Sequence, residues 1–249
     1  MTFFPSAARP VITPGQLLCM GLFTDDALSH WLSSVSLSHN LVNNVQSKEL
    51  LLNVHLAWPT LSAPISLLQL SFNMLEKGGK VQSRLGVLIL LSTWLAHCPN
   101  AVSHFVRLPN SIGLLMAQVG SNEHDELEVM VQSLCAFLLG LCLLFNNDSN
   151  ASFTRESLCQ LITRRIGVET FLDKLAEASK HEVYSKALKH PQIHIGSPEE
   201  VQLDYEFCRL YRSTASRLSS AGILELEVTL QLDQKSFLEL FAFLFLLST

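Results

Sequence analysis

The stretch VMVQSLCAFLLGLCLLFNND, residues 129–148, decides the fold class. Counting Gly140, twelve consecutive residues from Leu134 to Phe145 are apolar. As an α-helix this run spans about 18 Å, which is well short of the roughly 30 Å hydrocarbon core of a bilayer. Polar residues bound the run on both sides, and its length and its Leu and Ala content disfavour a β-strand. We therefore predict a helix that is buried by other helices.

Composition points the same way and excludes some functions. The chain has 249 residues, of which 48% are hydrophobic and 16% charged, and its mean hydropathy is +0.29. Such a composition indicates a membrane protein or unusually extensive helix-on-helix burial. A formal charge of -5 disfavours general nucleic-acid binding, which needs a basic surface. The N-terminus has prolines where a secretory signal would be apolar, so we expect a cytosolic chain. The six cysteines form no CxxC pair, so we expect buried free thiols.

Signals for helix starts and stops recur along the chain. Thr24, followed by two aspartates, reads as an N-cap, and Ser197-Pro198-Glu199-Glu200 reads as a second start. Gly78-Gly79 and Gly167 read as stops. Alternating, strand-like patterns are nearly confined to ILELEVTLQL near the C-terminus. We predict an all-α chain of about ten to twelve helices joined by short loops.

These helices repeat. VQSRLGVLILLSTWL at 81–95 aligns with VQSLCAFLLGLCLLF at 131–145, and shorter amphipathic helices are expected upstream of each, at 65–75 and 112–119. The tripeptide VQS occurs a third time at 45–47. A period of roughly 40 to 50 residues is typical of armadillo and HEAT solenoids. The predicted fold class is therefore an all-α, armadillo-like helical solenoid.

Motifs for catalysis are missing from the sequence. It contains no nucleophile elbow, P-loop, dinucleotide fingerprint or HExxH zinc motif. The cluster NEHDE at 122–126 could form a metal or acid–base site, but acidic residues in a first helical turn also complement the helix dipole, and we predict that structural role. We expect no enzymatic activity, no cofactor and no metal site. Core packing is predicted for the tryptophans and for one cysteine pair: Trp31, Trp58, Trp94, Cys135 and Cys142.

Five segments, in this order along the chain, carry a family resemblance. They are GQLLCMGLFTDDALSHWLSSVSLSHNL (15–41), SRLGVLILLSTWLAHCPNAVSHF (83–105), MVQSLCAFLLGLCLLFNND (130–148), LITRRIGVETFLDKLAEASKHEVYSKALKHPQ (161–192) and SPEEVQLDYEFCRLYR (197–212). The most specific pieces are RRIG, SKHEVYS and DYEF. Together they resemble the head domain of the general vesicular transport factors, a family of vesicle tethers of the Golgi.

The resemblance implies a non-enzymatic, armadillo-like head that captures vesicles arriving at the Golgi from the endoplasmic reticulum before membrane fusion. It implies a cytoplasmic protein that is peripheral on Golgi and vesicle membranes. The implied partners are an early-secretory Rab GTPase, the tethering and SNARE machinery, and a second copy of the head. In the family a coiled coil and an acidic, golgin-docking tail follow the head; this sequence shows neither, so golgin docking is not expected.

The same resemblance suggests three regions. We expect a flexible N-terminus at 1–14, an armadillo-like head region at 15–217 that lacks the earlier repeats, and a divergent apolar tail at 218–249 that reflects a splice form or an incomplete gene model. Two alternatives remain open. One is a generic armadillo scaffold with another partner, and the other is a membrane protein anchored by the apolar segment Phe237–Leu247.

Contact residues are expected near the end of the head. The segment 154–190 is rich in basic residues and could face an acidic partner, an anionic membrane or simply solvent. Within it we expect partner contacts at Arg164 and Arg165, and at Lys180, His181 and Tyr184 of SKHEVYS. The alternative for each of these residues is packing between the last helices.

Overall fold

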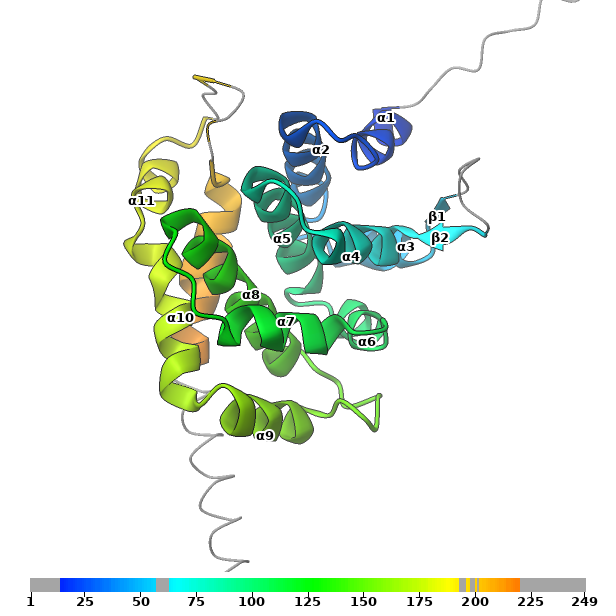
Figure 1. Ribbon diagram of the computed structural model, residues 1–249. Coiled ribbons are helices and arrows are strands. Elements are labelled where there is room, and N and C mark those ends of the chain that lie inside the picture. Colours follow the sequence, from blue (N-terminus) through cyan, green and yellow to red (C-terminus); the bar gives the residue numbers. More distant parts are fainter. Residues whose placement is uncertain (1–13, 57–62, 193–195, 198–199, 201, 220–249) are drawn as a thin grey trace, which may run out of the picture.

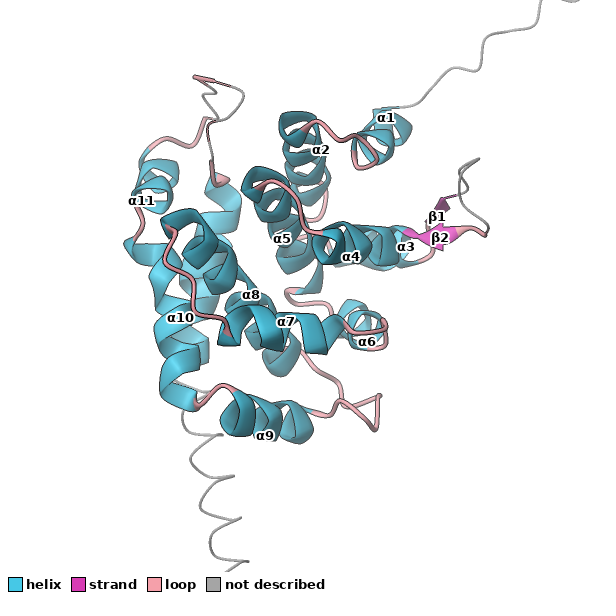
Figure 2. Ribbon diagram, viewed as in Figure 1, coloured by secondary structure: helices cyan, strands magenta, loops and turns pink. Residues whose placement is uncertain are grey.

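The computed structural model describes residues 14–56, 63–192, 196–197, 200 and 202–219 (Figure 1). Within these ranges the chain forms twelve helices and one short hairpin, which confirms the all-α prediction (Figure 2). The strands are β1 (His55–Leu56) and β2 (Ile65–Ser66), paired antiparallel with His55 opposite Ser66. The helices are α1 (Pro14–Gly21), α2 (Ala27–His39), α3 (Val45–Leu52), α4 (Leu67–Lys77), α5 (Val81–Leu95), α6 (Pro99–Val106), α7 (Ser111–Gly120), α8 (Glu126–Leu144), α9 (Arg155–Arg165), α10 (Val168–Lys180), α11 (Glu182–Lys189) and a last helix at 205–219.

Successive helix triplets stack on one another, as in a solenoid. One unit is α3–α4–α5 and the next is α6–α7–α8, and α3 contacts α6 while α5 packs along α8 (Figure 1). In both units a shorter helix precedes a long apolar one, as the repeat predicted. The third VQS tripeptide opens α3, a shorter helix on which Leu50 is 70% exposed. The helix that packs along the other side of α5 is α2.

The core is built around α5 and α8. Every residue from Leu85 to Leu95 and from Met130 to Leu143 is buried. The apolar run is part of a longer helix: α8 has 19 residues, and of the described helices it alone is long and apolar enough to cross a membrane. Its burial identifies it instead as a core helix, because 78% of its most apolar window is enclosed within the protein, against α5, α7 and α10.

Two of the expected helix starts are wrong. Asp26, not Thr24, caps α2, because its carboxylate accepts from the Ser29 amide at 2.8 Å while Thr24 Oγ1 accepts from the Asp26 amide. The start at Ser197 is also displaced, since Glu200 and residues 202–204 are not helical. The last helix begins after Asp204, whose Oδ2 accepts from the Phe207 amide at 3.0 Å. In both cases the residue three positions before the amide supplies the cap.

Other boundaries agree with the sequence. The glycine stops are confirmed: Gly78 and Gly79 follow α4 with φ of 76° and 106°, and Gly167 follows α9 with φ of 88°. The helix expected at 65–75 begins at Leu67, because Ile65 and Ser66 form β2. The segment ILELEVTLQL, the segment Phe237–Leu247 and Trp58 lie outside the described residues.

The contact between α2 and α5 is close enough to require a glycine. A Cβ atom at Gly86 of α5 would lie 2.9 Å from Trp31 Cα on α2, and backbone cannot move aside without separating the two helices. Gly120, at the end of α7, has open space around its own Cβ position. The two glycines therefore form a matched pair for testing how tightly the core is packed.

We expect Gly86→Ala to lower the free energy of unfolding by about 1 to 3 kcal/mol, because the added methyl overpacks the α2–α5 contact. Urea unfolding followed by far-ultraviolet circular dichroism measures this change. Gly120→Ala is the control and should cause no loss, since alanine favours a helix over glycine. Equal stability of the Gly86→Ala protein and the wild type would contradict the close packing described here.

Candidate protein-interaction site

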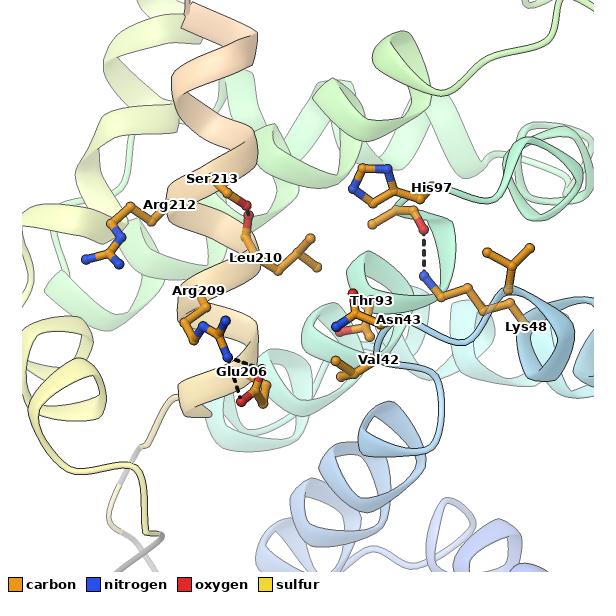
Figure 3. Close-up of a pocket in the computed structure, with 12 residues that line it drawn as sticks. Val42, Asn43, Lys48, Thr93, His97, Glu206, Arg209, Leu210, Arg212 and Ser213 are labelled. Carbon is orange, nitrogen blue, oxygen red and sulfur yellow. Dashed lines mark hydrogen bonds and ion pairs between the residues drawn. The ribbon is translucent and has the colours of Figure 1, made fainter.

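A groove of about 540 Å³ lies between the N-terminal helices and the helix at 205–219 (Figure 3). The turn between α2 and α3, the end of α5 and the helix at 205–219 form its walls. Its lining combines apolar side chains with three cations and one carboxylate, and consists of Val42, Asn43, Val45, Lys48, Thr93, Ala96, His97, Glu206, Arg209, Leu210, Arg212 and Ser213. A cleft of this size accommodates a few side chains of a ligand or partner.

Lys48 is the unusual residue of the groove. It is 4% exposed, and its ammonium donates to the Ala96 carbonyl oxygen at 2.6 Å. Its own main-chain carbonyl accepts from Trp94 Nε1 at 2.9 Å. Both the side chain and the main chain of Lys48 therefore connect α3 to the C-terminal end of α5. No carboxylate of the described residues forms an ion pair with the ammonium. Burial lowers the pKa of Lys48 to about 8.

His97 lies beside Lys48 at the end of α5. Its backbone has a φ of 55°, and its ring lies 4.5 Å from the ring of Phe145. Partial burial lowers the pKa of His97, and the charges on Lys48 and Arg217 act in the same direction. His97 is therefore neutral near pH 7, which leaves Lys48 as the charge on this wall of the groove.

The helix at 205–219 forms the opposite wall. Leu210 and Ser213 face Lys48 and His97, whereas Arg212 extends to the other side of the helix (Figure 3). Arg209 pairs with Glu206 at 3.2 Å on the rim. Asp204 holds the start of this helix in place, because its Oδ1 atom contacts His39 Nε2 of α2 at 2.8 Å while its other oxygen caps the helix.

The structure separates the five predicted contact residues. Arg164 and Arg165 are exposed in the last turn of α9, and Lys180 and His181 lie at the far end of α10. Since α10 has 13 residues, the two pairs are about 20 Å apart along its axis. Lys180 is exposed and pairs with Glu177 at 2.8 Å, and the Nδ1 atom of His181 accepts from the Val183 amide as the cap of α11.

Tyr184 is a core residue. It is 5% exposed, its hydroxyl donates to the Cys208 carbonyl at 3.3 Å, and its ring lies 5.7 Å from that of Tyr211. The expectation that Tyr184 is an exposed contact is therefore wrong, and packing between the last helices is its role. The apolar face of α11 explains this placement, because Tyr184 and Ala187 lie on the same side of it.

The basic segment 154–190 does not form one continuous face. Arg155 donates to the Asn146 carbonyl, and Lys174 donates to the Gln132 side chain and to the Ser121 carbonyl. Lys186 pairs with Glu200 at 2.7 Å. Three of the seven lysines and arginines in this segment therefore connect separate loops and helices within the protein.

The structure also places the NEHDE cluster and the predicted core residues. In NEHDE, Asp125 caps α8 by accepting from the Leu127 and Glu128 amides, which confirms the structural role. Glu128 pairs with Arg84 through two hydrogen bonds of 2.8 and 2.9 Å. No group of three metal-ligating side chains occurs in the described ranges. Burial in the core is confirmed for Trp31, Trp94, Cys135 and Cys142, and it raises the pKa of the Cys135 thiol to about 12.

Sequence reasoning missed the groove. Its residues come from positions 42–48, 93–97 and 206–213, which no local pattern connects. The local sequence around Lys48 gave no signal either, because a lysine next to Glu49-Leu50-Leu51 does not indicate that the lysine is buried and Leu50 exposed.

A rigid helical solenoid with a groove on its surface defines a class of recognition modules that bind other proteins. A model of the family described as Uso1 / p115 like vesicle tethering protein, head region, matches residues 8–221. General vesicular transport factor p115 of Mus musculus is 45% identical over 223 residues, and the protein of the same name from Homo sapiens is also 45% identical. Golgin candidate 6 of Arabidopsis thaliana is 25% identical over 189 residues, which are 70% of this chain and 20% of that protein. The chain belongs to the family of Uso1/p115-like vesicle-tethering head regions.

The match covers 88% of this chain but 23% of the mouse relative. The chain thus spans about a quarter of the length of the curated p115 relatives. The matched region includes every described helix, and with it the groove.

Lys48 allows a test of its burial through pH. Its pKa is lower in the folded chain than the ordinary value of 10.5, so between about pH 8 and 10.5 the unfolded chain binds more protons at this site. The free energy of unfolding should therefore rise with pH in this window, by up to about 3 kcal/mol from this residue. Lys48→Met should lack that rise in urea unfolding series, whereas Lys189→Met, at an exposed site on α11, should retain it. Parallel pH profiles for the wild type and Lys48→Met would contradict the buried placement.

Proposed function

We propose that this chain is the recognition head of a vesicle-tethering factor, and that it acts by protein–protein contact rather than by catalysis. The family match over residues 8–221, together with 45% identity to a general vesicular transport factor, carries the proposal. The proposed place of action is the cytoplasmic surface of Golgi and transport-vesicle membranes, where the chain promotes docking before fusion. A relative named golgin candidate 6 supports the Golgi assignment.

The physical basis is a rigid frame with exposed faces. Solenoid helices present an extended surface whose shape is fixed by the core beneath it. Binding then needs a few anchors surrounded by a polar rim, and no cofactor. The proposed partners are an early-secretory Rab GTPase, tethering and SNARE machinery, and a second copy of the head. Arg164, Arg165, Lys180 and His181 are the proposed contacts outside the groove.

A pull-down tests the Rab proposal. The purified chain is immobilised and incubated with an early-secretory Rab GTPase that is loaded with GTP or with GDP. We expect capture to be selective for the GTP form. A helical and monodisperse chain that captures neither form would contradict the proposed Rab contact. Light scattering on the same sample reports whether the mass is the 27.7 kDa of one chain or twice that value.

Charge reversal tests the proposed contact residues. We expect the double variant Arg164→Glu, Arg165→Glu to weaken GTP-selective capture about tenfold, because rim charges steer and hold complementary partners. Lys189→Glu, an exposed reversal on α11, is the matched control and should bind as the wild type does. Unchanged capture by the folded double variant would remove both arginines from the contact surface.

A further inference from the structure

The groove between the α2–α3 turn and the helix at 205–219 has no role in the contacts proposed above. It lies beside the ends of helices that are otherwise well packed, and its walls differ in character. One wall carries the ammonium of Lys48, and the other presents Leu210 and Ser213 (Figure 3). We therefore considered which chemical group would complete it.

The charge of Lys48 is the first part of the argument. An ammonium can donate three hydrogen bonds, and the described residues supply one acceptor, the Ala96 carbonyl. A buried cation without a carboxylate partner is costly, and a carboxylate brought in by a ligand would offset that cost. Arg209 is paired with Glu206 and Arg212 extends to the other side of its helix, so Lys48 is the cation of the lining that faces the groove without a carboxylate partner, in a chain whose formal charge is -5. The groove is thus a positive site on an acidic protein.

The apolar lining is the second part. Val42 and Leu210 are half-buried, and Val45 is 45% exposed at the edge. These side chains offer a surface on which an aliphatic side chain can pack next to the bound carboxylate. A groove that combines a positive charge with an apolar wall suits a peptide that alternates acidic and apolar residues.

The observations favour a peptide over a membrane surface. Anionic lipid surfaces attract clusters of exposed basic residues, and one buried lysine inside a narrow groove is not such a cluster. Arg212 extends away from this side, and Arg209 is already paired with Glu206.

We propose that this groove binds a short acidic segment of a partner protein, whose carboxylate contacts the Lys48 ammonium while a neighbouring aliphatic side chain packs on Val42 and Leu210. The inference rests on the proposed function, because it gives the chemistry of one partner of the tethering head. It concerns a surface separate from Arg164, Arg165, Lys180 and His181.

Fluorescence polarisation with the full chain tests the proposal. The probe is a fluorescein-labelled peptide in which glutamates lie between leucines, and a peptide with glutamines in place of the glutamates is the comparison. We expect the glutamate peptide to bind about tenfold more tightly, and we expect this preference to shrink as salt is raised. Equal binding of the two peptides, or binding of neither, would overturn the proposal.

Variants connect that binding to the groove. Lys48→Met should remove the preference for glutamate, and circular dichroism shows whether the variant is folded. Ser213→Glu is the second variant, because this exposed position can accept a carboxylate without loss of a core contact, and it should weaken binding of the glutamate peptide by a similar factor. Lys189→Met is the control and should bind as the wild type does. A preference that survives in Ser213→Glu and in folded Lys48→Met would place the peptide elsewhere and refute the site.

Two further readouts separate this proposal from the alternatives. The wild type could bind neither peptide and yet co-float with phosphatidylserine vesicles, while Lys48→Met does not co-float. In that case the groove binds a lipid headgroup and the peptide proposal is wrong. Rab capture is measured on the same variants. If the groove variants lose peptide binding but keep GTP-selective Rab capture, the groove is a second contact surface. If the wild type captures the Rab but binds neither peptide, the tethering role is supported and the groove proposal is wrong.

Discussion

The complete enclosure of α5 and α8 is the constraint on which the rest of the structure depends. Both helices are largely apolar and are buried around their whole circumference, so each is covered by neighbours on every side. Burying one large aliphatic side chain contributes about 1.5 to 3 kcal/mol, and α8 buries every residue from Met130 to Leu143. Stacking α5 against α8, with α2 on one side and α10 on the other, satisfies this requirement. The solenoid follows from it.

The few polar groups inside this core fix the last helix in place. Ser133 on α8 accepts from the Ala178 amide at 2.9 Å and contacts the Tyr211 hydroxyl at 3.1 Å, and that hydroxyl also donates to the Leu175 carbonyl. A buried hydroxyl without partners would be costly, so these bonds select one position for the helix at 205–219. Leu218 then packs against Gly140, where a Cβ atom would lie 2.6 Å from a Leu218 methyl. The core therefore fixes the position of the helix at 205–219, which forms one wall of the groove. The hydrogen bond between Trp94 and the Lys48 carbonyl fixes the opposite wall.

The sequence was sufficient to predict the fold class because apolar periodicity and glycine stops are local signals. The pairing of a short helix with a long apolar one was readable at 81–95 and 131–145, and Gly78-Gly79 and Gly167 marked ends correctly. The N-cap of α2 was harder to predict, because Thr24 and Asp26 both have suitable side chains and only the backbone geometry decides which of them caps the helix. For Tyr184 the sequence left contact and packing between the last helices open, and the choice depends on the Cys208 carbonyl, a distant group that accepts from its hydroxyl within the core.

The groove could not be predicted for a different reason. Its walls come from segments more than a hundred residues apart, and their meeting depends on how many repeats separate them and on how the helices at both ends are tilted. Lys48 shows the limit most clearly, because a lysine beside leucines in a short helix gives no sign that the leucine at 50 will face solvent while the lysine is buried. Tertiary packing decided which side of α3 faces inward.

Hydrogen–deuterium exchange of the purified chain in buffer without detergent tests the enclosure of α5 and α8 most directly. Amides in core helices exchange through the rarest opening events, whereas amides at surfaces and helix ends exchange quickly. The account predicts that peptides covering Leu85–Leu95 and Met130–Leu143 are the slowest to exchange, and that added detergent micelles leave their protection unchanged. Rapid exchange across Met130–Leu143 that becomes slow once micelles are added would contradict it, because this helix would then be covered by lipid-like surroundings rather than by its own protein.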